Sequence, residues 1–196
     1  MKDNKTLEVY NIKIHDYVDM VGKRPSDYLK SFVKRVVVNG LVLDLGCGPG
    51  NASAFMNSCG LATESFDASK AMVNWANKHF GINAKVKNFD DLNGVNIYDG
   101  VYANFSLLHA TKSDFEKHLS DIYISMKPTA IFSLGMKLGL GEKRDKLGRF
   151  YAYYSEPELL AIINKLGFKI IEKFFGEEKG LAGYLEPWIV IHMKKL

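Results

Sequence analysis

The fold of this chain is decided by the stretch Leu41-Val42-Leu43-Asp44-Leu45-Gly46-Cys47-Gly48-Pro49-Gly50. It begins as a short apolar run that contains one acid, and it then carries glycine at three alternate positions. After Asn51, apolar residues resume at helical spacing, so the order predicts a buried strand, a tight turn and a helix start. Glycine permits positive φ in such a turn and lets backbone N–H groups approach a ligand. In an open α/β sheet, this turn lies at the carboxyl edge, where ligands bind.

Two common nucleotide-binding motifs differ from this turn. A dinucleotide fingerprint reads Gly-x-Gly-x-x-Gly and a P-loop ends in Gly-Lys-Ser/Thr, whereas this stretch has Gly-x-Gly-x-Gly followed by asparagine. The run 44–50 instead resembles the first motif of class I S-adenosylmethionine-dependent methyltransferases. In that family the turn holds the methionine part of the cofactor. The resemblance implies cofactor-binding roles for Asp44, Gly46, Cys47 and Gly48. A purely structural glycine turn is the alternative.

Length and composition favour a single domain over residues 1–196. Of these residues 47% are hydrophobic, which is enough for a sizeable core. The net charge of +4 comes without a dense basic stripe, which disfavours nucleic acid as a partner. Two cysteines give neither a disulfide framework nor zinc spacing, so we expect no metal and a reducing cytosol. The N-terminus is polar and no apolar run approaches about 20 residues, so we expect a cytoplasmic protein without a membrane partner.

Residues 1–38 are predicted to form a helical lid, and residues 39–196 the α/β core. Apolar residues in the lid recur at three- and four-residue steps, and Pro25 is predicted to start its second helix. The segment 24–29 is similar to one in trans-aconitate-type small-molecule methyltransferases. There an arginine faces the cofactor carboxylate, which suits a fixed guanidinium. Arg24 is therefore a candidate cofactor ligand, with a solvated surface arginine as the alternative.

Residues 62–67 are predicted to form a second strand that ends in Asp67. An acid at this place accepts hydrogen bonds from both ribose hydroxyls, which NAD and S-adenosylmethionine share. The next residues resemble the family's second helix, with Ser69 as N-cap and Gly81 at the end. The resemblance assigns Ala68 and Met72 to the cofactor, although Met72 also suits ordinary core packing.

Residues 84–87 alternate like a third strand, and the chain then departs from the family's pattern. The family usually has Gly-Asp-Phe or Gly-Asp-Ala there, and the aspartate accepts from the adenine amino group. This chain reads Lys87-Asn88-Phe89 instead. An amide oxygen can still accept that bond, so Asn88 and Phe89 are assigned to the cofactor. Asp90 or Asp91 takes the role if the register differs.

Residues 98–103 are predicted to form the central strand, whose continuation Asn104-Phe105-Ser106-Leu107-Leu108-His109 lies at the reacting edge. It resembles methyltransferases that read Ala-x-x-Ser-Leu-Leu-His. It lacks the Asn/Asp-Pro-Pro-Tyr/Phe motif of enzymes that methylate planar nitrogens in nucleic acid. Asn104 and Phe105 are assigned to the cofactor. His109 is the histidine best placed to act as a base, since its ordinary pKa lies near neutrality; a structural, hydrogen-bonding histidine is the alternative.

The C-terminal part completes a doubly wound, Rossmann-like α/β sheet of seven strands, mostly parallel with the last antiparallel. It is predicted to contain a helix over 112–126, a strand over 129–134, a helix capped by Ser155, and strands over 168–175 and 188–193. Between them lies a loop cap at about 136–154. Its Arg144, Arg149 and Tyr151 suit an anionic or aromatic small acceptor. A mobile, solvated loop with the tyrosines packed underneath is the alternative.

The resemblance covers the chain from about residue 24 to its end. It implies transfer of the methyl group of S-adenosylmethionine to a nucleophile on a small molecule. Two other classes stay open. One is an NAD-dependent oxidoreductase, which shares the strand, the turn and Asp67. The other is a cofactor-binding module that is non-catalytic or depends on a partner, which the asparagine at position 88 leaves open.

Overall fold

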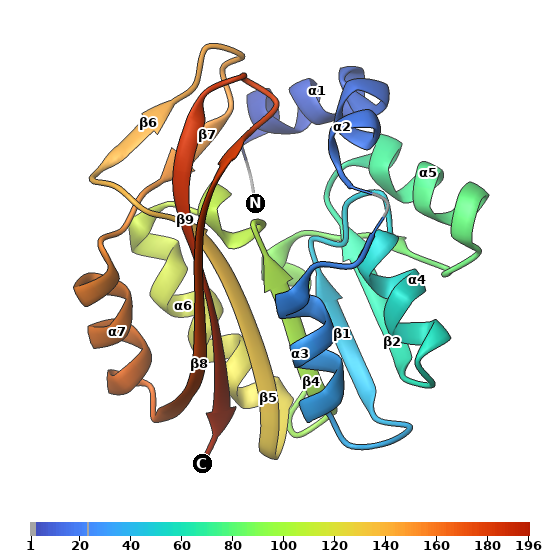
Figure 1. Cartoon of the computed structure of the whole chain (residues 1–196), viewed down its shortest axis with the longest axis vertical. Helices are drawn as coiled ribbons and strands as arrows, with labels where there is room; N and C mark the ends of the chain where they lie inside the picture. The colour runs from blue at the N-terminus through green and yellow to red at the C-terminus, as the bar shows by residue number, and fades with distance from the viewer. Residues whose placement is uncertain (1–2, 23) are drawn as a thin grey trace.

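A seven-stranded sheet with strand order β3-β2-β1-β4-β5-β9-β8 runs through the middle of the protein (Figure 1). The computed structural model describes residues 3–22 and 24–196. The strands are β1 (Leu41–Leu45), β2 (Ala62–Asp67), β3 (Lys85–Val86), β4 (Tyr98–Asn104), β5 (Met126–Lys137), β8 (Phe168–Lys179) and β9 (Leu185–Lys195). β9 pairs antiparallel with β5 and with β8, and the other neighbouring pairs are parallel. The predicted fold is therefore confirmed.

Helices cover both faces of this sheet. They are α1 (Asn4–Ile12), α2 (Ile14–Met20), α3 (Asp27–Arg35), α4 (Asn51–Ser58), α5 (Lys70–Phe80), α6 (Lys112–Ser125) and α7 (Glu156–Lys165), with 3₁₀ turns η1 (Phe89–Asp91) and η2 (Leu107–His109). Phe115, Leu119 and Ile122 of α6 are fully buried in the main core. Each such side chain contributes about 1.5–3 kcal/mol of transfer free energy. α3 and α4 close the opposite face.

Side-chain caps fix where four helices begin. The hydroxyls of Ser26, Ser69, Thr111 and Ser155 each accept a hydrogen bond from the backbone N–H three residues further on. The predicted caps Ser69 and Ser155 are thus confirmed. The predicted start at Pro25 is wrong, because the helix begins at Asp27 behind the Ser26 cap.

The first 38 residues form two different layers. α3 packs on the sheet, with Leu29 and Phe32 buried beside Val42. α1 and α2 instead lie across the carboxyl edge of the parallel strands, at the top of Figure 1. Of the predicted lid, only these two helices lie over the edge where ligands bind, and α3 belongs to the core. Residues 1, 2 and 23 of the predicted lid lie outside the described residues.

The segment 136–154 is largely ordered into strands. β5 continues to Lys137, and β6 (Glu142–Arg144) pairs antiparallel with β7 (Phe150–Ala152). We call residues 142–152 the cap hairpin. This pairing corrects the expectation of a loop, and Tyr151, Tyr153 and Tyr154 are buried. β8 and β9 are also longer than predicted, because they continue to pair beyond their buried parts.

No helix in the described part of the chain has the length and apolar character that crossing a membrane requires.

Candidate functional site

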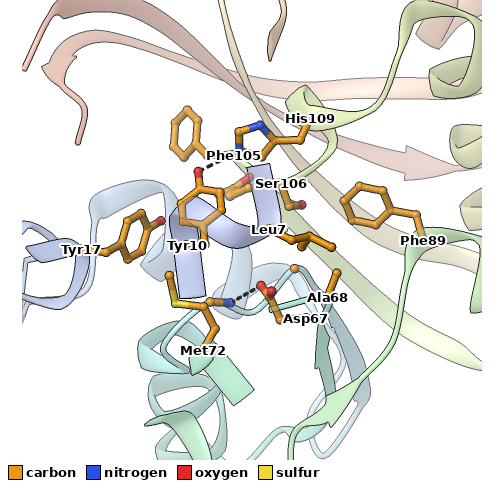
Figure 2. Close-up of a pocket in the computed structure, with 13 residues that line it drawn as sticks. Leu7, Tyr10, Tyr17, Asp67, Ala68, Met72, Phe89, Phe105, Ser106 and His109 are labelled. Atoms are coloured by element: carbon orange, nitrogen blue, oxygen red, sulfur yellow. Dashed lines mark hydrogen bonds between the residues drawn. The ribbon is translucent and has the colours of Figure 1, made fainter. Parts of the chain in front are cut away.

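A cavity lies at the carboxyl edge of the sheet, beneath α1 and α2 (Figure 2). Its volume is about 520 Å³, which includes space open to solvent. The lid helices contribute Leu7, Tyr10 and Tyr17. The remaining lining comes from the core and consists of Gly46, Gly48, Asp67, Ala68, Met72, Phe89, Asn104, Phe105, Ser106 and His109. The strand ends therefore meet at one place, as the sequence predicts.

The glycine turn after β1 leaves its backbone open toward the cavity. Gly48 has a φ of 53°, and a Cβ there would have only Cε1 of Tyr17 within 4 Å, at 3.9 Å. Gly46 has a φ of 78°, and its Cβ would lie 2.3 Å from Cβ of Ser106. Gly46 thus lets the continuation of β4 pack on the turn. Gly48 provides a backbone cradle that a side chain would fill.

Asp44 and Cys47 lie behind the turn, outside the cavity lining. Asp44 is 2% exposed, and its Oδ2 accepts a hydrogen bond from Oγ of Ser53 at 2.5 Å. Burial raises the pKa of Asp44 to about 7, and the nearby carboxylate of Asp67 raises it too. Burial also raises the pKa of the Cys47 thiol. These side chains support the turn from below, and their contact with a cofactor stays a prediction.

Asp67 ends β2 and places a carboxylate on the cavity lining. Its Oδ2 accepts from the backbone N–H of Gly48 at 3.0 Å, and its Oδ1 accepts from that of Ser69 at 2.8 Å. Burial raises the pKa of Asp67, and these backbone bonds oppose that shift. Each carboxylate oxygen keeps a further lone pair. Asp67 therefore joins the tips of β1 and β2 and can still accept from ligand hydroxyls.

Of the other residues assigned to the cofactor, some line the cavity and others lie outside it. Ala68, Met72 and Phe89 line the cavity beside Asp67 (Figure 2). Asn88 lies outside the lining, at the start of η1, where its backbone N–H donates to Asp91. Arg24 is exposed and also lies outside the lining. Roles for Asn88 and Arg24 stay predictions.

The end of β4 presents an unsatisfied donor and a strained residue to the cavity. Nδ2 of Asn104 is buried and has no hydrogen-bond partner among the described residues, whereas its Oδ1 accepts from Ser133. Phe105 has a φ of 57°, which is strained for an aromatic residue. Its ring packs edge-on against Trp188. Such features gather at ligand sites, which fits the predicted position of Asn104 and Phe105.

His109 is buried and hydrogen-bonded through both ring nitrogens. Nδ1 lies 2.6 Å from the carbonyl oxygen of Phe150, and Nε2 lies 2.8 Å from the hydroxyl of Tyr10. A carbonyl only accepts, so Nδ1 carries the proton and Nε2 accepts from Tyr10. Burial lowers the pKa of His109 to about 3, and the charge of Arg149 contributes in the same direction. This geometry favours the hydrogen-bonding role, and a base role stays a prediction.

The residues predicted to hold a substrate lie in the cap hairpin, outside the cavity lining. Arg149 is 2% exposed and donates Nε and Nη2 to Oδ2 of Asp145, at 2.9 and 2.7 Å. Arg144 donates Nη1 to Oδ2 of Asp3 at 2.8 Å. Tyr151 packs against the His109 ring, with 4.6 Å between centroids. Both guanidinium groups are therefore paired with carboxylates of this chain.

Four lining residues were missed by the sequence analysis: Leu7, Tyr10, Tyr17 and Ser106. The first three belong to helices whose apolar spacing does not tell which face meets a distant sheet edge. Ser106 stands in the Ser-Leu-Leu-His segment that the analysis quoted, which was the available signal. Its hydroxyl donates to the carbonyl of Leu45 at 2.6 Å and fixes β4 against β1.

Comparison with protein families gives a match to the family described as a methyltransferase domain, over residues 42–129. This region holds the glycine turn, Asp67 and the end of β4. Comparison with curated proteins gives no match.

Solved structures of similar fold include 1,6-didemethyltoxoflavin-N1-methyltransferase of Burkholderia thailandensis, with a TM-score of 0.78 and 19% identity over 97% of this chain and 87% of that one. Magnesium protoporphyrin IX methyltransferase of Synechocystis, with bound S-adenosylhomocysteine, gives a TM-score of 0.75 and 18% identity over 99% of this chain and 100% of that one. The [4+2]-cyclase SpnF gives a TM-score of 0.72 and 15% identity over 96% of this chain and 94% of that one. These likenesses show the fold.

The residues that match the family contain the core residues that line the cavity. At the cavity lie the open backbone of Gly48, the carboxylate of Asp67 and the side chain of Asn104, whose Nδ2 has no partner among the described residues. Residues 42–129 match the methyltransferase-domain family, and the chain as a whole has the fold of solved methyltransferases.

Proposed function

We propose that this enzyme transfers a methyl group to a nucleophile on a small, uncharged aromatic molecule. The observation that carries the proposal is one cavity in which a cofactor cradle adjoins an aromatic lining. S-adenosylmethionine supplies a methyl group that is already activated as a sulfonium. The protein has to bind both partners, exclude water and hold the acceptor in line with the methyl group.

The cofactor side of the cavity is formed by Gly46, Gly48, Asp67, Ala68, Met72 and Phe89. The open backbone of Gly48 permits close approach of the cofactor's polar end. Asp67 accepts hydrogen bonds from hydroxyl groups. Met72 and Phe89 offer apolar surface to a flat ring.

The acceptor side supports an uncharged aromatic molecule. Tyr10, Tyr17 and Phe105 contribute rings to the lining. Arg149, a candidate partner for an anion, is held by Asp145 in a buried ion pair. Breaking such a pair leaves a buried charge without compensation, at a cost of about 3–5 kcal/mol. Similarity to methyltransferases named for toxoflavin and protoporphyrin substrates also supports a small-molecule acceptor.

The lid provides the means to exclude water. Asn11 Oδ1 accepts from Oγ of Ser69 at 2.8 Å and from the N–H of Ala71 at 3.1 Å, which fastens α1 to the cofactor side. Oγ1 of Thr6 accepts from the N–H of Phe150 at 2.8 Å, which fastens α1 to the cap hairpin. A dry site strengthens the electrostatic interactions within it.

Two measurements test this function in sequence. The first is a thermal melt with S-adenosylmethionine, S-adenosylhomocysteine or NAD, each at about a hundred times an expected dissociation constant, where binding adds about 2.7 kcal/mol of stability. We expect a shift of several degrees with the two adenosyl-sulfur compounds and none with NAD. Stabilisation by NAD alone would support the oxidoreductase alternative and overturn this proposal.

The second measurement is release of S-adenosylhomocysteine with matched acceptors. We expect turnover with uncharged phenols and N–H heterocycles, and little with the corresponding benzoates. Preference for benzoates would contradict the uncharged acceptor. Tight cofactor binding with no turnover across the panel would support the non-catalytic, partner-dependent alternative.

A further inference from the structure

Tyr17 brings a hydroxyl group from the lid to the glycine turn. Its ring lines the cavity, and its Cε1 stands 3.9 Å from the position that a Cβ of Gly48 would occupy. The ring packs edge-on against Tyr10, with 5.5 Å between centroids. Figure 2 shows the Tyr17 hydroxyl turned toward Tyr10 and the other lining residues. The helix α2 therefore places a polar group beside the turn.

The Tyr17 hydroxyl has no hydrogen-bond partner among the residues that the structure describes, and only burial and nearby charges act on it. Burial raises the pKa of Tyr17, and the charge of Asp67 contributes in the same direction. The hydroxyl therefore keeps its proton, which a ligand can accept. The hydroxyl of Tyr10, by contrast, is occupied by three side chains, those of His109, Arg149 and Tyr151.

Within residues 46–50, which the structure describes in full, no backbone N–H is free for a ligand. Pro49 has none, and the others donate within the chain. The N–H groups of Gly46 and Cys47 donate to the carbonyl of Phe66, that of Gly48 to Asp67, and that of Gly50 to the carbonyl of Cys47. The turn therefore offers a ligand space, but a carboxylate beside it needs donors from another element.

The side chains on the described lining leave few hydrogens free. The hydroxyl and imidazole hydrogens of three residues are used within the chain, namely those of Tyr10, Ser106 and His109. The hydrogens that remain belong to the amide of Asn104, at the end of β4, and to the hydroxyl of Tyr17, beside the turn. Arg24, which the resemblance assigns to the cofactor carboxylate, is exposed and lies outside the lining. Tyr17 is thus the side-chain donor closest to the turn.

Resting on the function proposed above, we propose that the Tyr17 hydroxyl donates a hydrogen bond to the carboxylate of S-adenosylmethionine and thereby holds α2 closed over the cofactor. The carboxylate belongs to the methionine part, which the glycine turn receives. A bond from O–H to a carboxylate is charge-assisted and stronger than a neutral one. A ligand shifts an equilibrium only as far as it binds one state better, and this bond exists only while α2 is closed. Cofactor binding and lid closure are therefore coupled.

The test compares S-adenosylhomocysteine with 5′-(3-aminopropyl)thioadenosine, which lacks only the carboxylate. Both dissociation constants are measured by calorimetry on the full chain. We expect Tyr17→Phe to weaken S-adenosylhomocysteine binding about tenfold or more, the effect of one hydrogen bond to a charged group. The affinity for the aminopropyl compound should stay unchanged. Tyr123→Phe is the control, because its hydroxyl lies on α6 against the carbonyl of Leu196, and it should leave both affinities as they are.

Hydrogen exchange in α1 and α2 gives a second readout. In the wild-type protein, S-adenosylhomocysteine should slow this exchange more than the aminopropyl compound does. In Tyr17→Phe the two compounds should act alike, because the bond that distinguishes them is missing.

Three results would overturn the proposal. The first is an unchanged affinity of Tyr17→Phe for S-adenosylhomocysteine, and the second is an equal loss of affinity for both compounds, which would place the hydroxyl against another part of the cofactor. The third is a loss specific to S-adenosylhomocysteine in Arg24→Gln and not in Tyr17→Phe. Failure of the wild-type protein to bind S-adenosylhomocysteine would instead count against the proposed function, so the two failures are distinguishable.

Discussion

The hydroxyl of Tyr10 lies 2.8 Å from Nε2 of His109, although 99 positions separate these residues in the chain. The bond joins the lid to η2, the turn that follows the central strand. Thr6 and Asn11 hold the same helix on two sides of the cavity, through Phe150 and Ser69. α1 is therefore part of the site, and the state of the lid and the chemistry of the cavity are linked.

His109 should stay neutral throughout the range in which the enzyme is assayed. Burial disfavours the charged imidazolium and lowers the pKa to about 3. An NMR titration should show the ring of His109 unchanged between pH 8 and pH 5. Accordingly, no ionisation in the pH profile of turnover should belong to His109, and His109→Gln should leave the shape of that profile unchanged. A midpoint near the ordinary value of about 6.5 would contradict this.

Gly48→Ala should weaken S-adenosylhomocysteine binding, and Gly81→Ala is its matched control. Both glycines have positive φ, 53° and 62°, and neither Cβ would meet an atom closer than 3.9 Å. Each substitution should therefore lower the free energy of unfolding, measured by urea denaturation, by about 1–2 kcal/mol. Only the first adds a Cβ on the cavity side. Equal affinities in calorimetry would mean that Gly48 is a structural glycine alone.

Asp67→Ala should weaken binding of S-adenosylhomocysteine more than tenfold. The change removes two acceptors from the cavity and releases the N–H groups of Gly48 and Ser69. Asp99→Ala is the control, because Asp99 accepts from the N–H of Leu41 and from Lys127, outside the cavity. If calorimetry gives both variants the same affinity, the hydroxyl-binding role of Asp67 is wrong.

His192→Gln should flatten the acid side of the stability profile. His192 is fully buried against Phe174, and burial lowers its pKa to about 4, although Glu172 opposes the shift. The unfolded histidine titrates near 6.5, so between pH 4 and 6.5 the unfolded chain binds more protons. Stability therefore falls as pH decreases through this window, and at pH 5 the loss from His192 is about 2 kcal/mol.

Urea unfolding at pH 7.5 and pH 5 tests this, with the exposed His79→Gln as control. The drop between the two pH values should be smaller in His192→Gln than in the wild type. His109 contributes in the same direction and Asp44 in the opposite one, because its raised pKa makes the folded state bind the extra proton. Only the difference between variant and wild type is therefore informative. If the drop in stability between pH 7.5 and pH 5 is the same in His192→Gln and in the wild type, His192 is not a source of the acid sensitivity.

Thr6→Val should loosen the lid without disturbing the sheet. Oγ1 of Thr6 is buried, donates to Asp3 and accepts from the N–H of Phe150. Its removal leaves that N–H unpaired. Hydrogen exchange should become faster at Phe150 and through α1, and stay slow in β1 and β4. Thr63→Val, whose hydroxyl donates to Asn57 at the surface, should change neither. Uniform acceleration would indicate global destabilisation instead.

Local signals in the sequence were enough for most elements. β2 spans 62–67 as predicted, because the strand ends at Asp67 and the next helix has its own cap at Ser69. The lengths of β5, β8 and β9 were underestimated, because their outer parts are stabilised by pairing with another strand rather than by an alternating pattern. The start at Asp27 was missed because Pro25 is also a common first helical residue.

By itself, the sequence determined the succession of strands and helices along the chain, the glycine turn and the acid at the end of β2, since these depend on residues close together in the chain. Tertiary structure alone decided which partners the charged and aromatic residues found. Arg149 and Arg144 looked like candidates for an acceptor, yet Asp145 and Asp3 neutralise them. Tyr10 gave no signal, yet it lies in the cavity against His109. Side-chain pairing across distant segments depends on where the backbone brings them, and no local pattern encodes that distance.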